Sequence, residues 1–330
     1  MRASLAKRLV LALPTLLLVL TLTFVGLHLA PGDPVRLMLG PMSDPSAESA
    51  ARHELGLDRP MPVQYGTWLA RFVTGDWGTS IAQHRPVTGV LGDALGPTLL
   101  LTGLSLLLSY LAGIAVGALQ AAHRRSSLDT AITVVTTTLY ALPSYVLALV
   151  LVLCFAYGAV LWGWPLALRF PAIGVESVGA EFLSPGARLA DRVRHLVLPV
   201  LTLTVVGAAG AARFARGSMA EAMRQPFVTA ARAKGLAEST VVFRHALRNA
   251  LVPLIVLIGL QLPALFSGVV FVETIFAWPG MGRVTVQAVL ARDYPVVMAA
   301  TAVFATLVVA GNLLADALAS LADPRVRAES

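Results

Sequence analysis

Side chains that could act as acids, bases, nucleophiles or metal ligands are few in this chain and stand far apart in the sequence. The six histidines are dispersed, and none belongs to a His-Glu-x-x-His pattern of the kind that holds a catalytic zinc ion. The one cysteine, Cys154, lies in an apolar run, which excludes an internal disulfide and a cysteine-based metal cluster. A membrane-embedded hydrolase would need a nucleophile with a base, or a metal triad, near the end of a span. We find no such constellation, so the sequence predicts neither an enzyme nor a bound cofactor or metal.

The chain also lacks the residues that bind and hydrolyse ATP in a P-loop. Such a loop needs Gly-Lys-Ser/Thr, because its lysine reaches the β- and γ-phosphates. The two lysines of this chain, Lys7 and Lys234, both follow an alanine. The sequence therefore predicts that any ATP hydrolysis takes place on another subunit.

Cationic side chains gather in one stretch, residues 225–253, which lies between long apolar runs. They are Arg232, Lys234, Arg244, Arg248 and, when protonated, His245. We expect two short amphipathic helices here, separated at Gly235. Pro226 suits the first turn of the first helix, and Gly235 suits the position after its last residue, where a positive φ costs little.

The second helix of this stretch is expected to run from about Glu238 towards Leu251. Its apolar face would comprise Val241, Val242, Phe243, Ala246 and Leu247. A helix of this type can lie on a bilayer or in a groove of another protein. The sharp break at Gly235 favours the groove, because a surface anchor does not need it. Ala237, just before this helix, has no side-chain oxygen to cap it, which is expected to cost the start of the helix about 1 kcal/mol.

The composition of the chain indicates that a membrane domain positions the cationic stretch 225–253. Of the 330 residues 57% are hydrophobic and only 13% are charged, against about 25% charged in soluble domains. Six uncharged runs are candidates for spans, since a helix of about 20 apolar residues crosses the hydrocarbon core. They cover residues 9–30, 94–122, 130–157, 196–212, 250–272 and 294–315, the fourth being short and broken near its start by Pro199. A cleaved signal peptide is the alternative for the first run, but its length favours a retained span with the N-terminus inside.

Six spans that begin inside place both termini in the cytoplasm. The outer segments would be a polar lobe, residues 31–93, and a second polar loop, residues 158–195. Within the lobe, Asp44 to Gly56 is expected to form a capped helix that stops at the glycine. The inner segments, including residues 213–249, carry the excess of positive charge that gives the chain its net charge of +7. This distribution is typical of cytoplasmic loops, so nucleic acid is not expected as a partner.

The middles of the predicted spans contain no Asp, Glu, Lys or Arg, and His28, Glu273 and Asp316 lie only near span ends. A transporter driven by an ion gradient usually carries ionisable groups at membrane depth. Sodium sites built from backbone carbonyls at broken helices stay possible. The sequence therefore favours a translocator energised by a partner, with an ion-gradient-driven secondary transporter as the alternative.

Ordered blocks along the whole chain carry a resemblance to one family. Thr229-Ala-Ala with Gly235, followed by Arg244-His-Ala-Leu-Arg-Asn-Ala-Leu-Val-Pro253, resembles the EAA loop of bacterial ATP-binding-cassette importer permeases. More narrowly, the chain is similar to the dipeptide/oligopeptide/nickel permease family. Further matching blocks occupy residues 29–34, 54–65, 75–78, 142–144, 195–199, 273–280, 292–296 and 323–325. The loop departs from the broad motif at Thr229, where that motif has Glu, and at Arg248, where it has Pro.

The resemblance implies an all-α integral membrane protein with six transmembrane helices and the type I importer fold. Residues 1–30 would form the first span, 31–93 an extracytoplasmic lobe, 94–321 the permease core and 322–330 a cytoplasmic tail. The implied partners are the lipid bilayer, a second homologous permease, two cytoplasmic ATPase subunits that bind MgATP, and an extracytoplasmic binding protein. The implied location is the bacterial cytoplasmic membrane.

The resemblance also implies that the EAA loop docks on an ATPase subunit. Ala230, Ala231 and Gly235 would allow close packing, and Leu236 to Arg244 would form the coupling helix. The residues expected to take part in coupling are Ala230, Ala231, Lys234, Gly235, Leu236, Glu238, Val242, Phe243 and Arg244. Substitution Gly235→Asp is expected to leave the protein inserted but to abolish uptake.

The substrate follows only from the family, which favours di- or oligopeptides, with nickel, glutathione or glycosides as alternatives. Nothing in the predicted spans resembles a nickel site. The outer lobe would dock the binding protein, receive the released substrate or serve as a structural cap.

Overall fold

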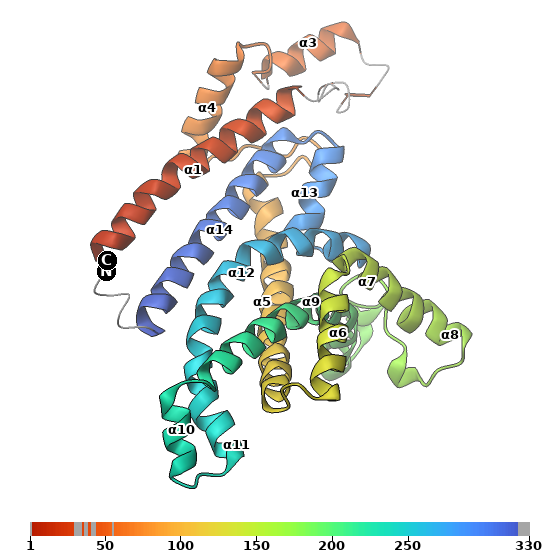
Figure 1. The fold of residues 1–330 in the computed structure, drawn as a ribbon. Helices are drawn as coiled ribbons and strands as arrows, with labels where there is room; N and C mark the ends of the chain where they lie inside the picture. The colour runs from red at the N-terminus through yellow and green to blue at the C-terminus, as the bar shows by residue number, and fades with distance from the viewer. Residues whose placement is uncertain (1, 30–34, 36–38, 41–43, 55, 323–330) are drawn as a thin grey trace. The chain divides into compact units, whose positions relative to one another are not determined.

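The computed structural model describes residues 2–29, 35, 39–40, 44–54 and 56–322. All regular elements among these residues are helices, and the described backbone holds one isolated bridge, between Thr79 and Pro86 (Figure 1). The matching blocks at residues 29–34 and 323–325 and the predicted tail fall mostly outside the described residues. The chain divides into two compact units, one made of residues 2–98 and 279–310 and the other of residues 99–278 with 311 onward.

The unit made of residues 2–98 and 279–310 contains the predicted outer lobe. Its helices are α1 (Arg2–Leu29), α3 (Pro45–Glu54), α4 (Met61–Val73), α13 (Met281–Leu290) and the first parts of α5 (Val87–Ala122) and α14 (Tyr294–Ala322). Its core joins α5 to α13 and α14, with Val87 and Leu91 packed near Met281 and Val296. The predicted helix over residues 44–56 is confirmed as α3. The Asp44 carboxylate accepts a hydrogen bond from Ser46 N at 3.2 Å, and Gly56 has a φ of +67°.

A buried aspartate, Asp293, holds the start of α14 against the turn that precedes α5. Its carboxylate accepts hydrogen bonds from the Ser80 hydroxyl, from Ala82 N at 3.1 Å and from Val296 N at 3.4 Å. Asp293 and Ser80 are each only 1% exposed. The carboxylate thus caps the start of α14 and also accepts hydrogen bonds from Ser80 and Ala82 in the turn before α5.

Replacing Asp293 by alanine should destabilise this unit by about 1–3 kcal/mol, because the Ser80 hydroxyl and two amides lose their acceptor in a buried place. The control is Asp93→Ala, which removes an exposed ion pair with Arg85 and should cost at most about 1 kcal/mol. The measurement is the thermal unfolding midpoint of the purified chain in detergent. Equal midpoints for the two variants would contradict the prediction.

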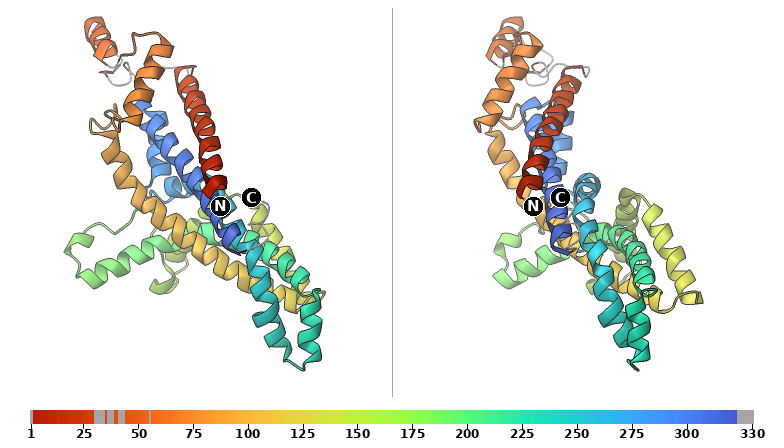
Figure 2. Two further views of the ribbon diagram at one scale, coloured as in Figure 1. Left: turned by 90° about the vertical axis from the view of Figure 1, so that its left-hand side faces the viewer. Right: turned by 60° about the vertical axis from the view of Figure 1, so that its left-hand side comes forward.

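The other unit, residues 99–278 with 311 onward, contains the cationic stretch. After α5 come α6 (Ser127–Ala141), α7 (Ser144–Val152), a π turn (Leu153–Gly158) and α8 (Ala159–Leu161). Two 3₁₀ turns (Leu166–Leu168 and Ala180–Phe182) precede the long α9 (Pro185–Ala222). Then follow α10 (Pro226–Ala233), α11 (Glu238–Thr240), a second π turn (Val241–Ala246) and α12 (Leu247–Ile275) (Figures 1 and 2). Its main core includes Leu101, Leu198, Val272, Phe276 and Trp278.

Four helices are long and apolar enough to cross a membrane: Val87–Ala122, Ser144–Leu161, Pro185–Ala222 and Tyr294–Ala315. A shorter apolar helix, Leu13–Leu29, falls in the first predicted span, and α12 covers the fifth. The described residues thus contain four candidate membrane spans, whereas the count of six stays a prediction.

Two of the predicted span limits are wrong. The run at 130–157 is not one helix, because α6 ends at Ala141 and Leu142 is extended, with a ψ of 128°. A residue before proline avoids the helical region, so Leu142 before Pro143 breaks the run. The short run at 196–212 is the middle of α9, which Pro199 does not interrupt. Residues 213–222, expected in a loop, are therefore helical.

Candidate functional site

The cationic stretch folds as two helical segments on either side of Gly235, as predicted. Gly235 has a φ of +75° and ends α10 in a Schellman arrangement. Leu236 N donates to Ala231 O at 3.4 Å, and Gly235 N donates to Arg232 O at 2.9 Å. Pro226 occupies the first turn of α10, where its missing N–H is harmless. This local chemistry forces the chain to reverse between α10 and α11.

The second segment differs from the predicted coupling helix over Leu236 to Arg244. Leu236 and Ala237 are not helical, and the helix begins at Glu238. It does not stop near Arg244 or Leu251 but continues through the π turn into α12 as far as Ile275. Pro253, two residues after Leu251, lies inside α12 and does not end the helix.

The start of α11 is held by a charged pair in place of a capping side chain. Ala237 is the N-cap residue and makes no side-chain cap hydrogen bond. The Arg232 guanidinium donates to the Glu238 carboxylate at 2.6 and 3.0 Å across the reversal. These hydrogen bonds lower the pKa of the Glu238 carboxyl. Both side chains are exposed, so the pair contributes at most about 1 kcal/mol.

The inner face of the two segments is anchored by small apolar contacts. Val228 and Ala231 of α10 pack with Val241 of the π turn. Val242 and Ala246 pack in turn with residues of α9 and α5, namely Met219, Ala222, Ala118 and Ala121. Of the predicted apolar face, Val241, Val242 and Ala246 are buried, but Phe243 is 54% exposed. Phe243 lies one residue beyond the buried face, so the predicted apolar face is divided into a buried part and an exposed part.

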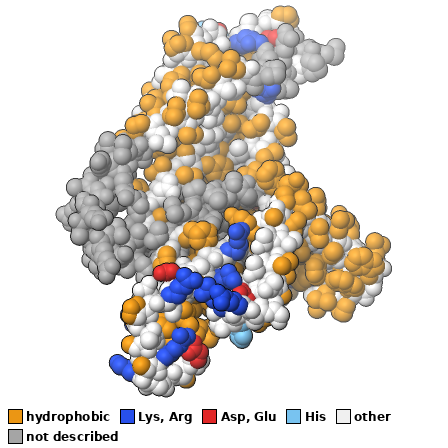
Figure 3. Space-filling view, viewed as in Figure 1, with side chains coloured by type: hydrophobic (Ala, Val, Ile, Leu, Met, Phe, Trp, Pro, Cys, Tyr) orange, Lys and Arg blue, Asp and Glu red, His pale blue; other side chains and the backbone are white. Residues whose placement is uncertain are grey.

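The outer face of α10, the reversal and α11 is left uncovered. We call it the α10–α11 surface, and it consists of Ala230, Lys234, Gly235, Leu236, Glu238, Phe243 and Arg244, all exposed. Of the nine residues expected in coupling, only Ala231 and Val242 are buried, at 6% and 3% exposure. They support the surface from behind. Lys234 and Arg244 form no ion pair within the described part of the chain, and Figure 3 shows Lys and Arg gathered in this region.

The α10–α11 surface combines two large apolar side chains, Leu236 and Phe243, with unpaired cations. Such a surface can enter a groove on a partner, where aromatic and cationic side chains carry much of the binding energy. The searched residues hold no group of three or more His, Cys, Asp or Glu side chains that could bind a metal ion.

Several polar contacts of this unit were not predicted from the sequence, and two of them illustrate the reason. Asp191 and His195 stand four residues apart on α9, and the imidazole Nδ1 lies 2.8 Å from Asp191 O and 3.7 Å from the carboxylate. The Asp191 carboxylate accepts hydrogen bonds from Ser177 N and Oγ, so it ties the predicted outer loop to α9. The helical spacing was visible in the sequence. The second pair, Asp129 with Arg216, spans 87 residues, which no local pattern could indicate.

Two family descriptions match the chain. "Binding-prot-dependent transport system membrane comp, N-term" matches residues 1–102, and "Binding-protein-dependent transport system inner membrane component" matches residues 113–328. The oligopeptide transport system permease protein AppB of Bacillus subtilis is 39% identical over 99% of both chains. The glutathione transport system permease protein GsiC is 36% identical in Salmonella typhimurium and 37% in Pectobacterium atrosepticum, over 97% of each chain.

The second family description alone covers more than half of the chain, and the identity to these relatives extends over nearly their full length. The relatives are permeases, which are transport components and not enzymes. The resemblance inferred from the ordered sequence blocks is thereby confirmed. The chain belongs to the family of binding-protein-dependent transport system inner membrane components, and it is a permease subunit of an ATP-binding-cassette importer.

Proposed function

We propose that this permease forms, with a second homologous permease, a pathway for di- and oligopeptides across the bacterial cytoplasmic membrane. Two cytoplasmic ATPase subunits would energise it, and an extracytoplasmic binding protein would deliver the peptide. The chain would contribute six spans of the type I fold, with both termini in the cytoplasm. Residues 31–93 would form the outer lobe, 94–321 the core and 322–330 the tail.

The α10–α11 surface is the observation that supports this proposal most. It is uncovered, it is mounted on α5, α9 and α12 by Val242 and Ala246, and its exposed side chains include Leu236, Phe243, Lys234 and Arg244. We propose that it sits in a groove of an ATPase subunit. Movement of that subunit would then act directly on helices that enter the membrane.

The substrate class is inferred from the relatives. One is named for oligopeptide transport and two for glutathione transport. Glutathione is itself a tripeptide, so a short peptide backbone with free termini is the chemistry that these names share. We therefore propose small peptides as the substrate class, and glutathione belongs to that class. Transport of nickel would require a different kind of binding site.

Uptake should require ATP and the complete set of subunits. We expect labelled tripeptide to enter proteoliposomes that contain both permeases, both ATPase subunits and the binding protein, with ATP inside, and unlabelled dipeptides or glutathione to compete. The purified chain alone should hydrolyse no ATP. Uptake under a proton or sodium gradient without ATP would favour a secondary transporter. Competition by Ni²⁺ but not by peptides would overturn the substrate assignment.

A further inference from the structure

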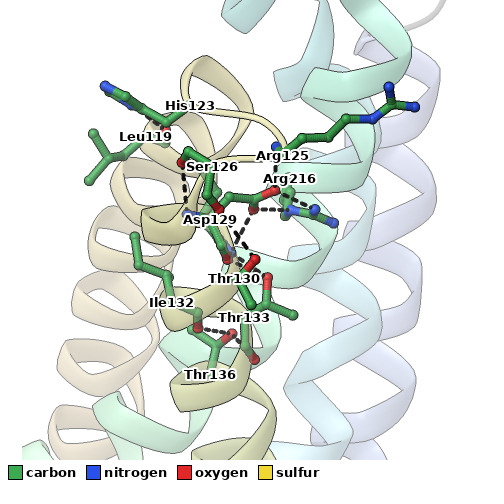
Figure 4. A network of polar contacts seen from close by, with 11 residues as sticks. Leu119, His123, Arg125, Ser126, Asp129, Thr130, Ile132, Thr133, Thr136 and Arg216 are labelled. Carbon is green, nitrogen blue, oxygen red and sulfur yellow. Dashed lines mark hydrogen bonds and ion pairs between the residues drawn. The ribbon is translucent and has the colours of Figure 1, made fainter.

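A buried carboxylate, Asp129, links the start of α6 to α9 (Figure 4). The Arg216 guanidinium donates to both carboxylate oxygens, from Nε to Oδ1 and from Nη2 to Oδ2, each at 2.8 Å. The Asp129 side chain is 4% exposed, whereas that of Arg216 is 39% exposed. A two-bond contact between a planar guanidinium and a carboxylate fixes orientation as well as distance.

Two other elements also hold the Asp129 carboxylate. Arg125, in the turn between α5 and α6, has a φ of +65° and donates its backbone N–H to Oδ2 at 3.1 Å. Gln120 of α5, which is 1% exposed, directs its amide towards Oδ1 at 3.5 Å and donates to the Thr133 hydroxyl at 3.0 Å. The carboxylate therefore meets α5, the turn, α6 and α9 at a single point.

Helix capping does not explain the contact with α9. Ser126 is the N-cap of α6, and its hydroxyl accepts from Asp129 N at 3.2 Å. An acid three residues after the cap would normally reach back to the backbone N–H of the cap residue. Such a local cap is complete without a partner from another helix. The arginine on α9 adds a cross-link that the start of α6 does not need for its own sake.

Arg216 lies close to the residues that carry the α10–α11 surface. One turn further along α9, Met219 and Ala222 pack with Val242 and Ala246 behind that surface. On the other side of Arg216, Ala215 packs against Gly117 of α5, where a Cβ atom would come within 2.5 Å. Contacts therefore run without a gap from α10 through the π turn and α9 to Asp129. Beyond Asp129, α6 is tied to α9 by this ion pair and by Tyr140, whose ring centre lies 5.0 Å from the Arg213 guanidinium; the ion pair is the contact that reaches the start of α6.

We propose that Asp129 and Arg216 are positioning residues for transport, and that their ion pair passes the displacement of the α10–α11 surface to α6. This inference rests on the proposed docking of that surface on an ATPase subunit. With the pair intact, the inner ends of α5, α6 and α9 move as one body. Without the ion pair, α9 still moves with the α10–α11 surface, but α6 does not move with α9. ATP hydrolysis then continues while the pathway fails to change from one open side to the other.

The test compares ATP hydrolysis with peptide uptake in the complete importer in proteoliposomes. We expect Arg216→Gln to reduce the number of peptides transported per ATP about tenfold, a change within the range of coupling between distant sites. Hydrolysis stimulated by the binding protein should persist. Arg216→Lys keeps the charge but loses the two-bond geometry, and it should give an intermediate ratio. The control is Arg124→Gln, which removes an exposed cation from the turn between α5 and α6. It should leave the number of peptides transported per ATP unchanged.

A second variant separates positioning from simple stability. Arg216→Gln leaves a buried carboxylate unpaired and is expected to lower the yield of folded protein. The double variant Asp129→Asn with Arg216→Gln removes that charge and should recover the yield. Its ratio of peptides to ATP should stay low, because the rigid ion pair is still missing. A normal ratio in the double variant would overturn the proposal.

Failure of the docking proposal would be visible separately. It would appear in the unsubstituted importer as uptake that does not depend on ATP, or as hydrolysis that the permease does not influence. Parallel losses of uptake and hydrolysis in Arg216→Gln, both restored in the double variant, would assign the pair a structural role only.

Discussion

A Gly235→Asp variant should be inserted in the membrane at normal level and should show no peptide uptake. A Cβ at this position would meet nothing within 4 Å, so the side chain has room. The φ of +75° is uncommon for residues other than glycine, but Asp and Asn adopt it more readily than others. The chain should therefore fold, and the loss should come from a carboxylate placed within the α10–α11 surface where the partner docks.

Gly235→Asn is the matched control, because asparagine has the same shape and the same tolerance of a positive φ but no charge. We expect it to retain most of the uptake, measured per molecule of permease in the membrane. Copurification of the ATPase subunits should fall for the aspartate variant alone. If both variants lose uptake, backbone strain is the cause. If neither does, Gly235 is not at the docking surface.

The second large effect is expected at Gly117, where α5 and α9 are in close contact. A Cβ at Gly117 would lie 2.5 Å from the Ala215 Cβ and 2.6 Å from the Ala212 carbonyl oxygen, and Gly113 is similarly crowded by Ala211. The Ala212 oxygen is a backbone atom and the Ala215 Cβ is attached directly to the backbone, so neither can move away by a rotation of its side chain. Gly117→Ala should therefore force the helices apart and destabilise the unit by about 1–3 kcal/mol.

Gly217→Ala on α9 makes the same chemical change in open space, since a Cβ there would meet nothing within 4 Å. It should stabilise the helix by about 0.5–1 kcal/mol, because alanine loses less conformational freedom than glycine. The thermal unfolding midpoints of the two variants in detergent should therefore move in opposite directions. A midpoint for Gly117→Ala at or above that of the unsubstituted chain would contradict the packing argument.

Local signals predicted the parts of the fold that depend on a few neighbouring residues. Pro226 and Gly235 gave the limits of α10, and Asp44 and Gly56 gave those of α3, because caps and stops act within one helical turn. The break at Leu142 was also available, since Pro143 follows it. It was missed because an uncharged run was interpreted as one helix.

Other features depend on contacts between residues further apart in the sequence. Helix α9 begins before its uncharged run partly because Ser184 caps its start, which is a local signal, and partly because Arg188 and Arg192 pair with Glu176 in the preceding loop. The exposure of Phe243 depends on which side of the π turn packs on Met219 and Ala222. The Asp129–Arg216 pair depends on the position of α9 beside α6. Composition and spacing carry no information on such pairings.

The helix that begins at Glu238 continues to Ile275, and at 1.5 Å per residue it is about 55 Å long. The hydrocarbon core is about 30 Å thick, so this one helix is longer than the barrier that it would cross. It can then act as a lever. A tilt of about 10° at the end beside Gly235 would move the far end by about 10 Å, if the helix stays stiff over that length. An angular change too small to disturb the packing behind α10 could thus open or close a passage wide enough for a peptide.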